Sequence, residues 1–123
     1  MNLYASREDY LEAILVLYKK FGSVRSVDIA RHMGVSKPSV CHAVNVLCDG
    51  GFLTKDDKHF ISLTEEGRKV AEKIYERHKF FKEQLISAGV RPNIAETEAC
   101  RIEHCISDES FLKLKEYREK GKG

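Results

Sequence analysis

Hydrophobic and polar positions alternate with helical spacing along residues 28–53, DIARHMGVSKPSVCHAVNVLCDGGFL. In the first part, Ile29, Ala30 and Met33 recur at positions i, i+1 and i+4, which places them on one face of a short helix. Gly34 then provides a residue that adopts the left-handed conformation at low cost, so the helix can end there. The pattern therefore predicts a short helix followed by a tight turn.

A longer helix is predicted after this turn, with Ser36 as its N-cap and Pro38 in its first turn, where a missing N–H costs nothing. Its hydrophobic stripe comprises Val40, Val44, Leu47 and Cys48, and its opposite face carries Ser39, His42, Asn45 and Asp49. Gly50 and Gly51 end it. This pattern is typical of a helix-turn-helix, whose second helix enters a DNA major groove. The alternative, a plain helical hairpin, does not require small polar residues at the start of its second helix.

Two short segments rich in β-forming residues, 52–55 and 59–63, flank the charged sequence Asp56-Asp57-Lys58. They predict a β-hairpin with a charged tip, the wing of a winged helix. Basic residues there would contact backbone phosphates, which position a protein on DNA without reading its sequence. DNA contacts are accordingly expected from Ser36, Lys37, Pro38, Ser39, His42, Asn45, Lys55 and Lys58.

Helices are predicted on both sides of this segment. The first runs from Asn2 to Phe21, and Ser26 is expected to cap the next helix. The core face of the first comprises Leu11, Ile14, Leu15 and Tyr18. Thr64 is expected to cap a long helix whose hydrophobic face carries Val70, Ile74, His78, Phe81 and Leu85.

The last part of the chain is expected to hold two more helices. One extends from Asn93 to Ile106, and the other follows the cap sequence Ser107-Asp108-Glu109. The apolar face of the former comprises Ile94, Ala95, Ile102, Cys105 and Ile106, and the latter carries Phe111, Leu112 and Leu114. The predicted fold is mainly α: a winged helix-turn-helix domain over 1–72 and a helical dimerisation and metal-binding region over 73–123.

Three potential metal ligands are spaced along one face of the helix predicted up to Ile106. Cys100, Glu103 and His104 stand at positions i, i+3 and i+4 and offer a thiolate, a carboxylate and an imidazole. The candidates for the remaining coordination positions, from two other helices, are His78, Asp9 and Glu12. Sulfur and nitrogen ligands disfavour magnesium or calcium, and several carboxylates disfavour a closed tetrahedral zinc site. Manganese(II) or iron(II) fits best.

Each of these residues has a simpler interpretation when taken alone. His78 would be a hydrogen-bonded core histidine, and Cys100 a small buried hydrophobe. Asp9 and Glu12 would be a solvated helix face, so periodicity leaves the metal site open. Cys100 and His104 would also suit a thiol enzyme or metallohydrolase, but the sequence shows no oxyanion-type glycine loop.

Composition narrows the classes of protein that fit. A chain of 123 residues, 42% hydrophobic and 33% charged, suits one compact unit or a small domain with a helical extension. The net charge of +2 is low for a DNA-binding protein, so dimerisation or a bound cation would strengthen binding. Four cysteines without a CxxC pair disfavour a disulfide framework. Without a long apolar run or a signal pattern, a cytoplasmic location and no membrane association are expected.

The sequence resembles the diphtheria toxin repressor and manganese transport regulator family of metal-dependent bacterial repressors. The resemblance covers nearly the whole chain, from EDYLEAI through DIA–MGVSKPSV and LT–G to ERH and EACRIEHCISDE. It implies that the first motif, the histidine of ERH and the last motif supply the metal ligands. These positions are Asp9, Glu12, His78, Cys100, Glu103 and His104, the same six residues that spacing suggested.

The chain departs from each branch of that family. Manganese-type members have a glutamate where Cys100 stands, and iron-type members have a methionine where Asp9 stands. The ancillary site of the iron-type members corresponds to Glu96 and Lys82, and a protonated lysine cannot bind a metal. No counterpart of their C-terminal SH3-like domain is expected in this sequence.

The sequence thus predicts a homodimeric transcriptional repressor, not an enzyme, that Mn²⁺ or Fe²⁺ activates. It would bind a palindromic operator in double-stranded DNA, with recognition helices about 34 Å apart or a multiple of that, and control metal homeostasis. One alternative is a winged-helix regulator that responds to a small molecule, for which chelation would change nothing. Another is a winged helix that binds proteins rather than DNA.

Overall fold

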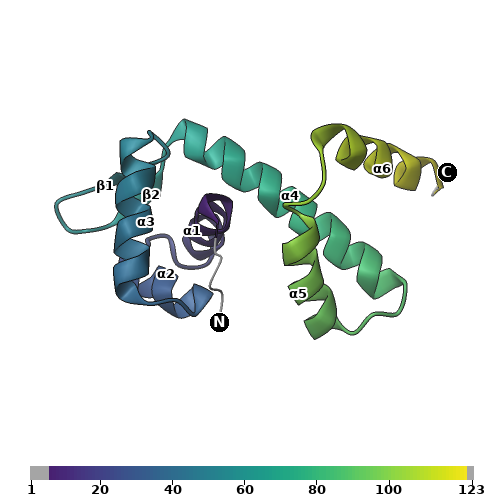
Figure 1. The fold of residues 1–123 in the computed structure, drawn as a ribbon, viewed down its shortest axis with the longest axis horizontal. Coiled ribbons are helices and arrows are strands. Elements are labelled where there is room, and N and C mark those ends of the chain that lie inside the picture. Colours follow the sequence, from purple (N-terminus) through teal and green to yellow (C-terminus); the bar gives the residue numbers. More distant parts are fainter. Residues whose placement is uncertain (1–5, 122–123) are drawn as a thin grey trace. The chain divides into compact units, whose positions relative to one another are not determined.

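The computed structural model describes residues 6–121 of the chain and is mainly α-helical (Figure 1). In chain order the elements are α1 (Arg7–Phe21), α2 (Ser26–Met33), α3 (Lys37–Asp49), β1 (Leu53–Lys55), β2 (Ile61–Leu63), α4 (Glu65–Ser87), α5 (Pro92–Ile102) and α6 (Asp108–Gly121). They form two compact units that divide between Lys73 and Ile74, within α4. Among the described residues, none of these helices has the length and apolar character to span a membrane.

α1 begins at Arg7, whereas the sequence predicted a start at Asn2; residues 2–5 lie outside the described part of the chain. Ser6 is the N-cap because its Oγ accepts a hydrogen bond from the Asp9 N–H at 3.1 Å. The Ser6 N–H donates in turn to Oδ2 of Asp9 at 3.0 Å, which completes a capping box. One carboxylate oxygen of Asp9 therefore has a structural role at the start of the helix.

The core face of α1 is mostly as predicted. Leu11, Ile14 and Leu15 are buried, but Tyr18 is 51% exposed, so its assignment to the core was wrong. Tyr18 lies in the last turn of the helix, where every side chain is exposed. Periodicity assigned it to the right face without indicating where the core ends.

α2 and α3 form the predicted helix-turn-helix. Ser26 is the first residue of α2 rather than its cap; Arg25 is the N-cap, and its N–H donates to Oδ2 of Asp28 at 2.9 Å. Gly34 ends α2 with φ of 68°, in the left-handed region where glycine avoids steric strain. The predicted Ser36 cap of α3 is confirmed, and the stripe of Val40, Val44 and Leu47 is buried.

The wing is confirmed as a short antiparallel hairpin (Figure 1). Leu53 pairs with Leu63 and Lys55 with Ile61, and the Ile61 N–H donates to the Val24 carbonyl at 2.8 Å. At the tip, Asp56 Oδ1 accepts hydrogen bonds from two backbone N–H groups, which fixes the turn. The hairpin thus fixes the positions of its exposed lysines, Lys55 at the end of β1 and Lys58 in the turn.

Thr64 joins the wing to α4, as predicted. Its hydroxyl accepts from the Gly67 N–H at 3.1 Å and donates to the Gly51 carbonyl at 2.7 Å. A Cβ at Gly67 would lie 2.0 Å from the Phe52 carbonyl oxygen, so only glycine allows this close approach. The start of α4 is thereby fixed against the end of α3 and the wing.

The second unit is built around aromatic rings. Phe80 and Phe81 of α4 meet Phe111 of α6, and the ring of Phe80 lies edge-on to both of the others, with centroids 5.2 and 5.4 Å away. Ala99 of α5 completes this buried cluster, with Ile102 and Ile106 packed against it. The elements α4, α5 and α6 therefore share one small apolar core.

The prediction that a single helix extends from Asn93 to Ile106 was wrong at its end. α5 ends at Ile102, and the following residues form a turn before Ser107 caps α6 by accepting from the Ser110 N–H at 3.1 Å. Cys105, predicted on the apolar face, is exposed because it lies beyond the helix. Glu103, predicted as a metal ligand, is completely buried.

Candidate metal centre and DNA-binding surface

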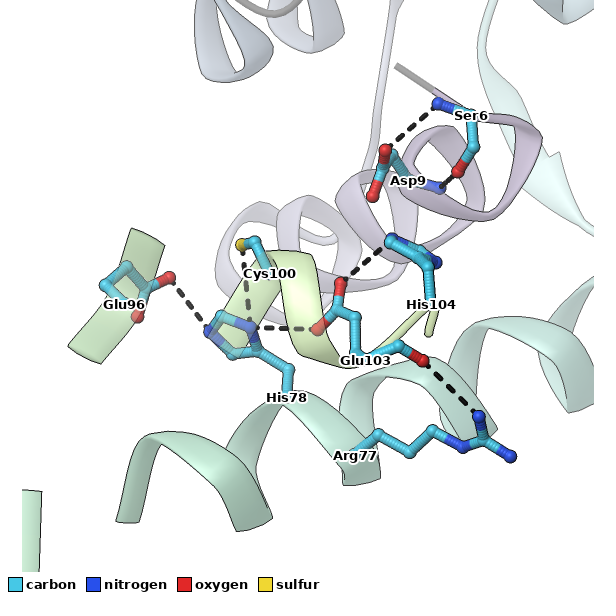
Figure 2. A network of polar contacts seen from close by, with 8 residues as sticks. All are labelled: Ser6, Asp9, Arg77, His78, Glu96, Cys100, Glu103 and His104. Atoms are coloured by element: carbon cyan, nitrogen blue, oxygen red, sulfur yellow. Dashed lines mark hydrogen bonds and ion pairs between the residues drawn. The ribbon is translucent and has the colours of Figure 1, made fainter. Parts of the chain in front are cut away.

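Three of the predicted ligands meet in the second unit (Figure 2). The Nδ1 atom of His78, on α4, lies 3.0 Å from Oε2 of Glu103 and 3.6 Å from Sγ of Cys100, on α5. One donor atom from each of these side chains lies within 4.8 Å of the others. The helical phase explains this convergence: Cys100 occupies the last turns of α5, and Glu103 follows as its C-cap with helical backbone angles.

Glu103 is the unusual member of this group because its carboxylate is fully buried. Oε2 contacts His78, whereas Oε1 has no hydrogen-bond partner among the described residues and lies 3.3 Å from Nε2 of His104. A buried carboxylate needs compensating positive charge, since burial alone strongly disfavours its ionised form. The site is therefore suited to a cation.

His78 supplies positive charge in the metal-free protein. Hydrogen bonds to Cys100 and then to Glu103 raise its pKa from 6.5 to about 11, against a smaller effect of burial that lowers it. The imidazole is thus protonated at neutral pH, and both ring nitrogens carry hydrogen. A metal ion that binds Nδ1 must displace this proton.

The other ring nitrogen of His78 faces a different carboxylate. Nε2 lies 2.9 Å from Oε1 of Glu96, and Oε2 of Glu96 lies 2.8 Å from Nζ of Lys82. Burial tends to raise the pKa of Glu96, but the hydrogen bonds from Lys82 and His78 outweigh it and lower that pKa. Glu96 is therefore an ionised bridge between a histidine and a lysine.

Arg77 fixes the turn that presents the ligands. Its Nη1 donates to the carbonyls of Glu103, at 3.3 Å, and Ile106, at 2.6 Å, and its Nη2 pairs with Asp108. These bonds satisfy the carbonyl of the C-cap of α5 and a carbonyl of the turn that follows it. The sequence pattern did not indicate Arg77, for which the available signal was its place directly before His78 on α4.

The other three predicted ligands are His104, Asp9 and Glu12, which are not part of the cluster of Cys100, His78 and Glu103. His104 lies in the turn after α5 and contacts the carboxylate of Glu103. Asp9 and Glu12 belong to α1, in the first unit. Their part in a metal site, and that of the whole six-residue set, stays a prediction.

The donor set fits a transition-metal ion. A thiolate, an imidazole and a carboxylate are the ligands such ions take, and the thiolate disfavours calcium or magnesium. The structural observation that supports this fit is the fully buried carboxylate of Glu103, whose Oε1 has no hydrogen bond and lies at ion-pair distance from His104. The structure pairs Cys100 with His78, whereas the enzyme alternative had paired Cys100 with His104.

The residues predicted to contact DNA lie on exposed surfaces of the first unit. Ser36 to Ser39 form the start of α3, and His42 and Asn45 follow on its outer face. Lys55 and Lys58 are exposed on the wing. Arg25 at the base of the wing stacks over the Phe60 ring, 4.3 Å from its centroid.

Arg7, at the start of α1, is a further candidate that the sequence pattern did not indicate. It lines an open groove with Pro38, Ser39 and His42 of α3, residues that had been predicted to contact DNA. The guanidinium of Arg7 adds positive charge beside the start of α3, in a chain whose net charge of +2 is low for a DNA-binding protein. No signal in the sequence placed Arg7 there, because the groove is formed by segments distant along the chain.

Two family models together match almost the whole chain. Residues 2–59 match "Iron dependent repressor, N-terminal DNA binding domain", and residues 64–122 match "Iron dependent repressor, metal binding and dimerisation domain". The transcriptional regulator MntR of Escherichia coli is 34% identical over 113 residues, which cover 92% of this chain and 73% of that protein. An uncharacterised HTH-type transcriptional regulator of Methanocaldococcus jannaschii is 33% identical over 119 residues, 95% of each chain.

A solved structure with the same fold is that of the manganese regulator SloR. It superposes with a TM-score of 0.84 at 26% identity and covers 95% of this chain. The chain spans 55% of the length of that structure. The likeness therefore extends over both units of this chain and about half of the relative.

Proposed function

Because the chain belongs to the iron-dependent repressor family, the family of the diphtheria toxin repressor and the manganese transport regulator, we propose that it is a dimeric, metal-activated repressor of transcription. Membership of this family confirms the resemblance inferred from the sequence motifs. The observation that carries the proposal is the cluster of partly buried Cys100 with buried His78 and Glu103 in a chain that also holds a winged helix. A role in metal homeostasis and a cytoplasmic location are part of the proposal.

The proposed activating ion is manganese(II) or iron(II). The proposed ligands are Asp9, Glu12, His78, Cys100, Glu103 and His104. A bound divalent ion would supply positive charge to the buried Glu103 carboxylate, whose Oε1 has no hydrogen bond. His78 would then give up the proton on Nδ1, and Cys100 would bind the ion as its thiolate.

The proposed ligands belong to two different units, and this offers a way for metal binding to act on the DNA-binding unit. Asp9 and Glu12 belong to the DNA-binding unit, whereas Cys100, Glu103 and His104 belong to the other. Binding by both groups at once would favour one orientation of the winged helix. At an ion concentration about 100 times the Kd, metal binding stabilises the orientation that binds the ion by about 2.7 kcal/mol. The population of the two orientations changes only to the extent that the second orientation binds the metal more weakly than the first.

DNA binding is assigned to α3 and the wing. The exposed start of α3 would enter the major groove, and Lys55, Lys58 and Arg7 would contact phosphates. A homodimer would place two such units on a palindromic operator. The exposed apolar side chains on α6, which support a partner surface in the second unit, are Leu112, Leu114 and Tyr117.

The central test measures DNA binding with and without metal. Protein purified without oxygen is analysed for bound metal, and its DNA site is selected from random duplexes in the presence of Mn²⁺. Affinity is then measured with Mn²⁺, with Fe²⁺ and with a chelator. We expect binding to weaken at least tenfold on chelation, and equal affinities would reject metal activation in favour of a regulator with another trigger.

Two cysteine variants separate the metal site from general effects of cysteine loss. Cys100→Ala should weaken the response to metal without unfolding the protein, because the side chain is small and only partly buried. Cys105→Ala is the matched control, since this cysteine is exposed. Loss of folding in Cys100→Ala would show a structural cysteine instead of a ligand.

The DNA surface is tested through Lys37. Lys37→Ala should weaken binding to all sequences alike and lower the slope of log affinity against log salt by about 0.9. Glu65→Ala, an exposed residue at the start of α4, is a control for unrelated surface changes. A changed base preference in Lys37→Ala would contradict its assignment to phosphate.

A further inference from the structure

The two ring nitrogens of His78 face different surroundings (Figure 2). Nδ1 points toward Cys100 and Glu103, the other members of the donor cluster. Nε2 points the opposite way, toward Oε1 of Glu96 at 2.9 Å. The ring can therefore reach the metal cluster through one nitrogen only, as long as Glu96 holds the other.

Glu96 is itself held in place from its far side. Its Oε2 lies 2.8 Å from the ammonium group of Lys82, one turn further along α4 from His78. The carboxylate thus joins two residues of α4 to α5. Both Glu96 and Lys82 are partly exposed, with 49% and 39% of their side chains accessible, so the pair contributes little to folding by itself.

A neutral imidazole carries hydrogen on one nitrogen and offers a lone pair on the other. A carboxylate that accepts the Nε2–H stabilises the form whose lone pair is on Nδ1. Such a partner also orients the ring and makes the ligating nitrogen more basic. Glu96 stands where it can do all of these things for His78.

We propose that Glu96 is a positioning residue of the metal centre. Held in place by Lys82, it accepts the Nε2–H of His78, so that Nδ1 is the ring nitrogen that binds the ion. Lys82 acts through Glu96 and never contacts the ion. Its ammonium group also supplies positive charge next to Glu96, so a second cation is not needed on the Nε2 side. This inference rests on the proposed metal site, and its test separates the two.

The experiment uses Cd²⁺ as the probe on the whole 123-residue chain. Protein with isotope-labelled histidine is loaded with a magnetically active cadmium isotope, and the scalar coupling identifies which nitrogen of His78 binds. Affinity is measured in parallel by calorimetry, and circular dichroism checks the fold. We expect coupling to Nδ1 in the natural protein; coupling to Nε2 would overturn the inference.

Substitutions of Glu96 test its role directly. Glu96→Ala should weaken Cd²⁺ binding by about 10- to 100-fold and allow coupling to Nε2 to appear. Glu96→Gln keeps an oxygen that accepts the Nε2–H, so it should retain coupling to Nδ1 and lose less affinity than Glu96→Ala. Glu98→Ala, an exposed glutamate on the same helix, is the matched control and should change affinity less than about twofold. Natural affinity in Glu96→Ala would overturn the inference.

Lys82 is tested in a double-mutant cycle. Lys82→Met should weaken binding less than Glu96→Ala does, and it should add almost nothing in the Glu96→Ala background. Additive losses would show that Lys82 acts independently of Glu96, against the inference. If the natural protein bound no Cd²⁺, the proposed function itself would fail, whereas binding that ignores Glu96 would leave that function standing.

Discussion

The two units of this protein place their polar chemistry differently. In the DNA-binding unit the described polar side chains proposed to act on DNA are exposed, and the core is made of residues such as Ile29, Val40 and Leu47. In the second unit, Arg77, His78 and Glu103 are buried beside a small aromatic core. The chemistry proposed for the first unit therefore lies on its surface, and that proposed for the second unit lies in its interior.

This difference changes how each unit is stabilised. An apolar core gains stability from burial alone, and the exposed polar face costs little. Buried charges instead depend on their partners, because removing one partner leaves the other uncompensated. The second unit should therefore respond far more to pH, metal and the loss of single polar side chains than the first.

The largest expected effect is at Arg77. Arg77→Ala removes a buried guanidinium from two carbonyls and from Asp108, and it should destabilise the second unit by about 3 kcal/mol. Urea unfolding measures this loss. Lys113→Ala is the control, because both side chains of its pair with Glu116 are largely exposed, so the pair should contribute less than about 1 kcal/mol. Equal effects would show that the buried network is no more important than a surface pair.

A pH dependence is expected next. The pKa of His78 is raised from 6.5 to about 11 in the folded protein, so its stabilising contribution is present below pH 6.5 and is lost as pH rises through 11. Urea unfolding of metal-free protein should therefore show a less stable second unit at alkaline pH. His78→Gln should remove this dependence. Metal binding has the opposite sign: each displaced proton strengthens it by about tenfold per pH unit, and a pH-independent affinity would contradict the displacement of that proton.

A smaller effect is expected in the first unit at the cap of α3. Ser36→Ala removes an oxygen that accepts from the Ser39 N–H at 3.2 Å, so it should cost about 1 kcal/mol. Unfolding by urea gives the value. Asn45→Ala, on the exposed face of the same helix, should change stability by less than about 0.5 kcal/mol. A cost near zero for Ser36→Ala would mean that the capping bond is replaced by water.

The smallest effect tests the corrected edge of the core. Tyr18→Ser should change stability by less than about 0.5 kcal/mol, because the side chain is 51% exposed. Leu15→Ala, on the same helix and buried, should cost about 3 kcal/mol. Thermal unfolding compares the two. A large loss in Tyr18→Ser would restore the tyrosine to the core.

Much of the first unit could be predicted from the sequence because its patterns are local. Ser36, Gly34 and the stripe of Val40, Val44 and Leu47 each act within a few residues of the chain. The errors, at Ser26 and Tyr18, concern where an element begins or how far the core extends. Those limits depend on packing against other segments, which periodicity does not describe.

In the second unit the sequence alone determined the family, the mainly helical fold and the kinds of side chain available for metal. Only the tertiary structure decided that α5 ends at Ile102, that Glu103 is fully buried and that Arg77 holds the turn between them and α6. It also decided which nitrogen of His78 meets Glu96. The physical reason is that local spacing fixes residue types and helical faces, whereas desolvation and the pairing of buried charges arise only when distant segments pack together.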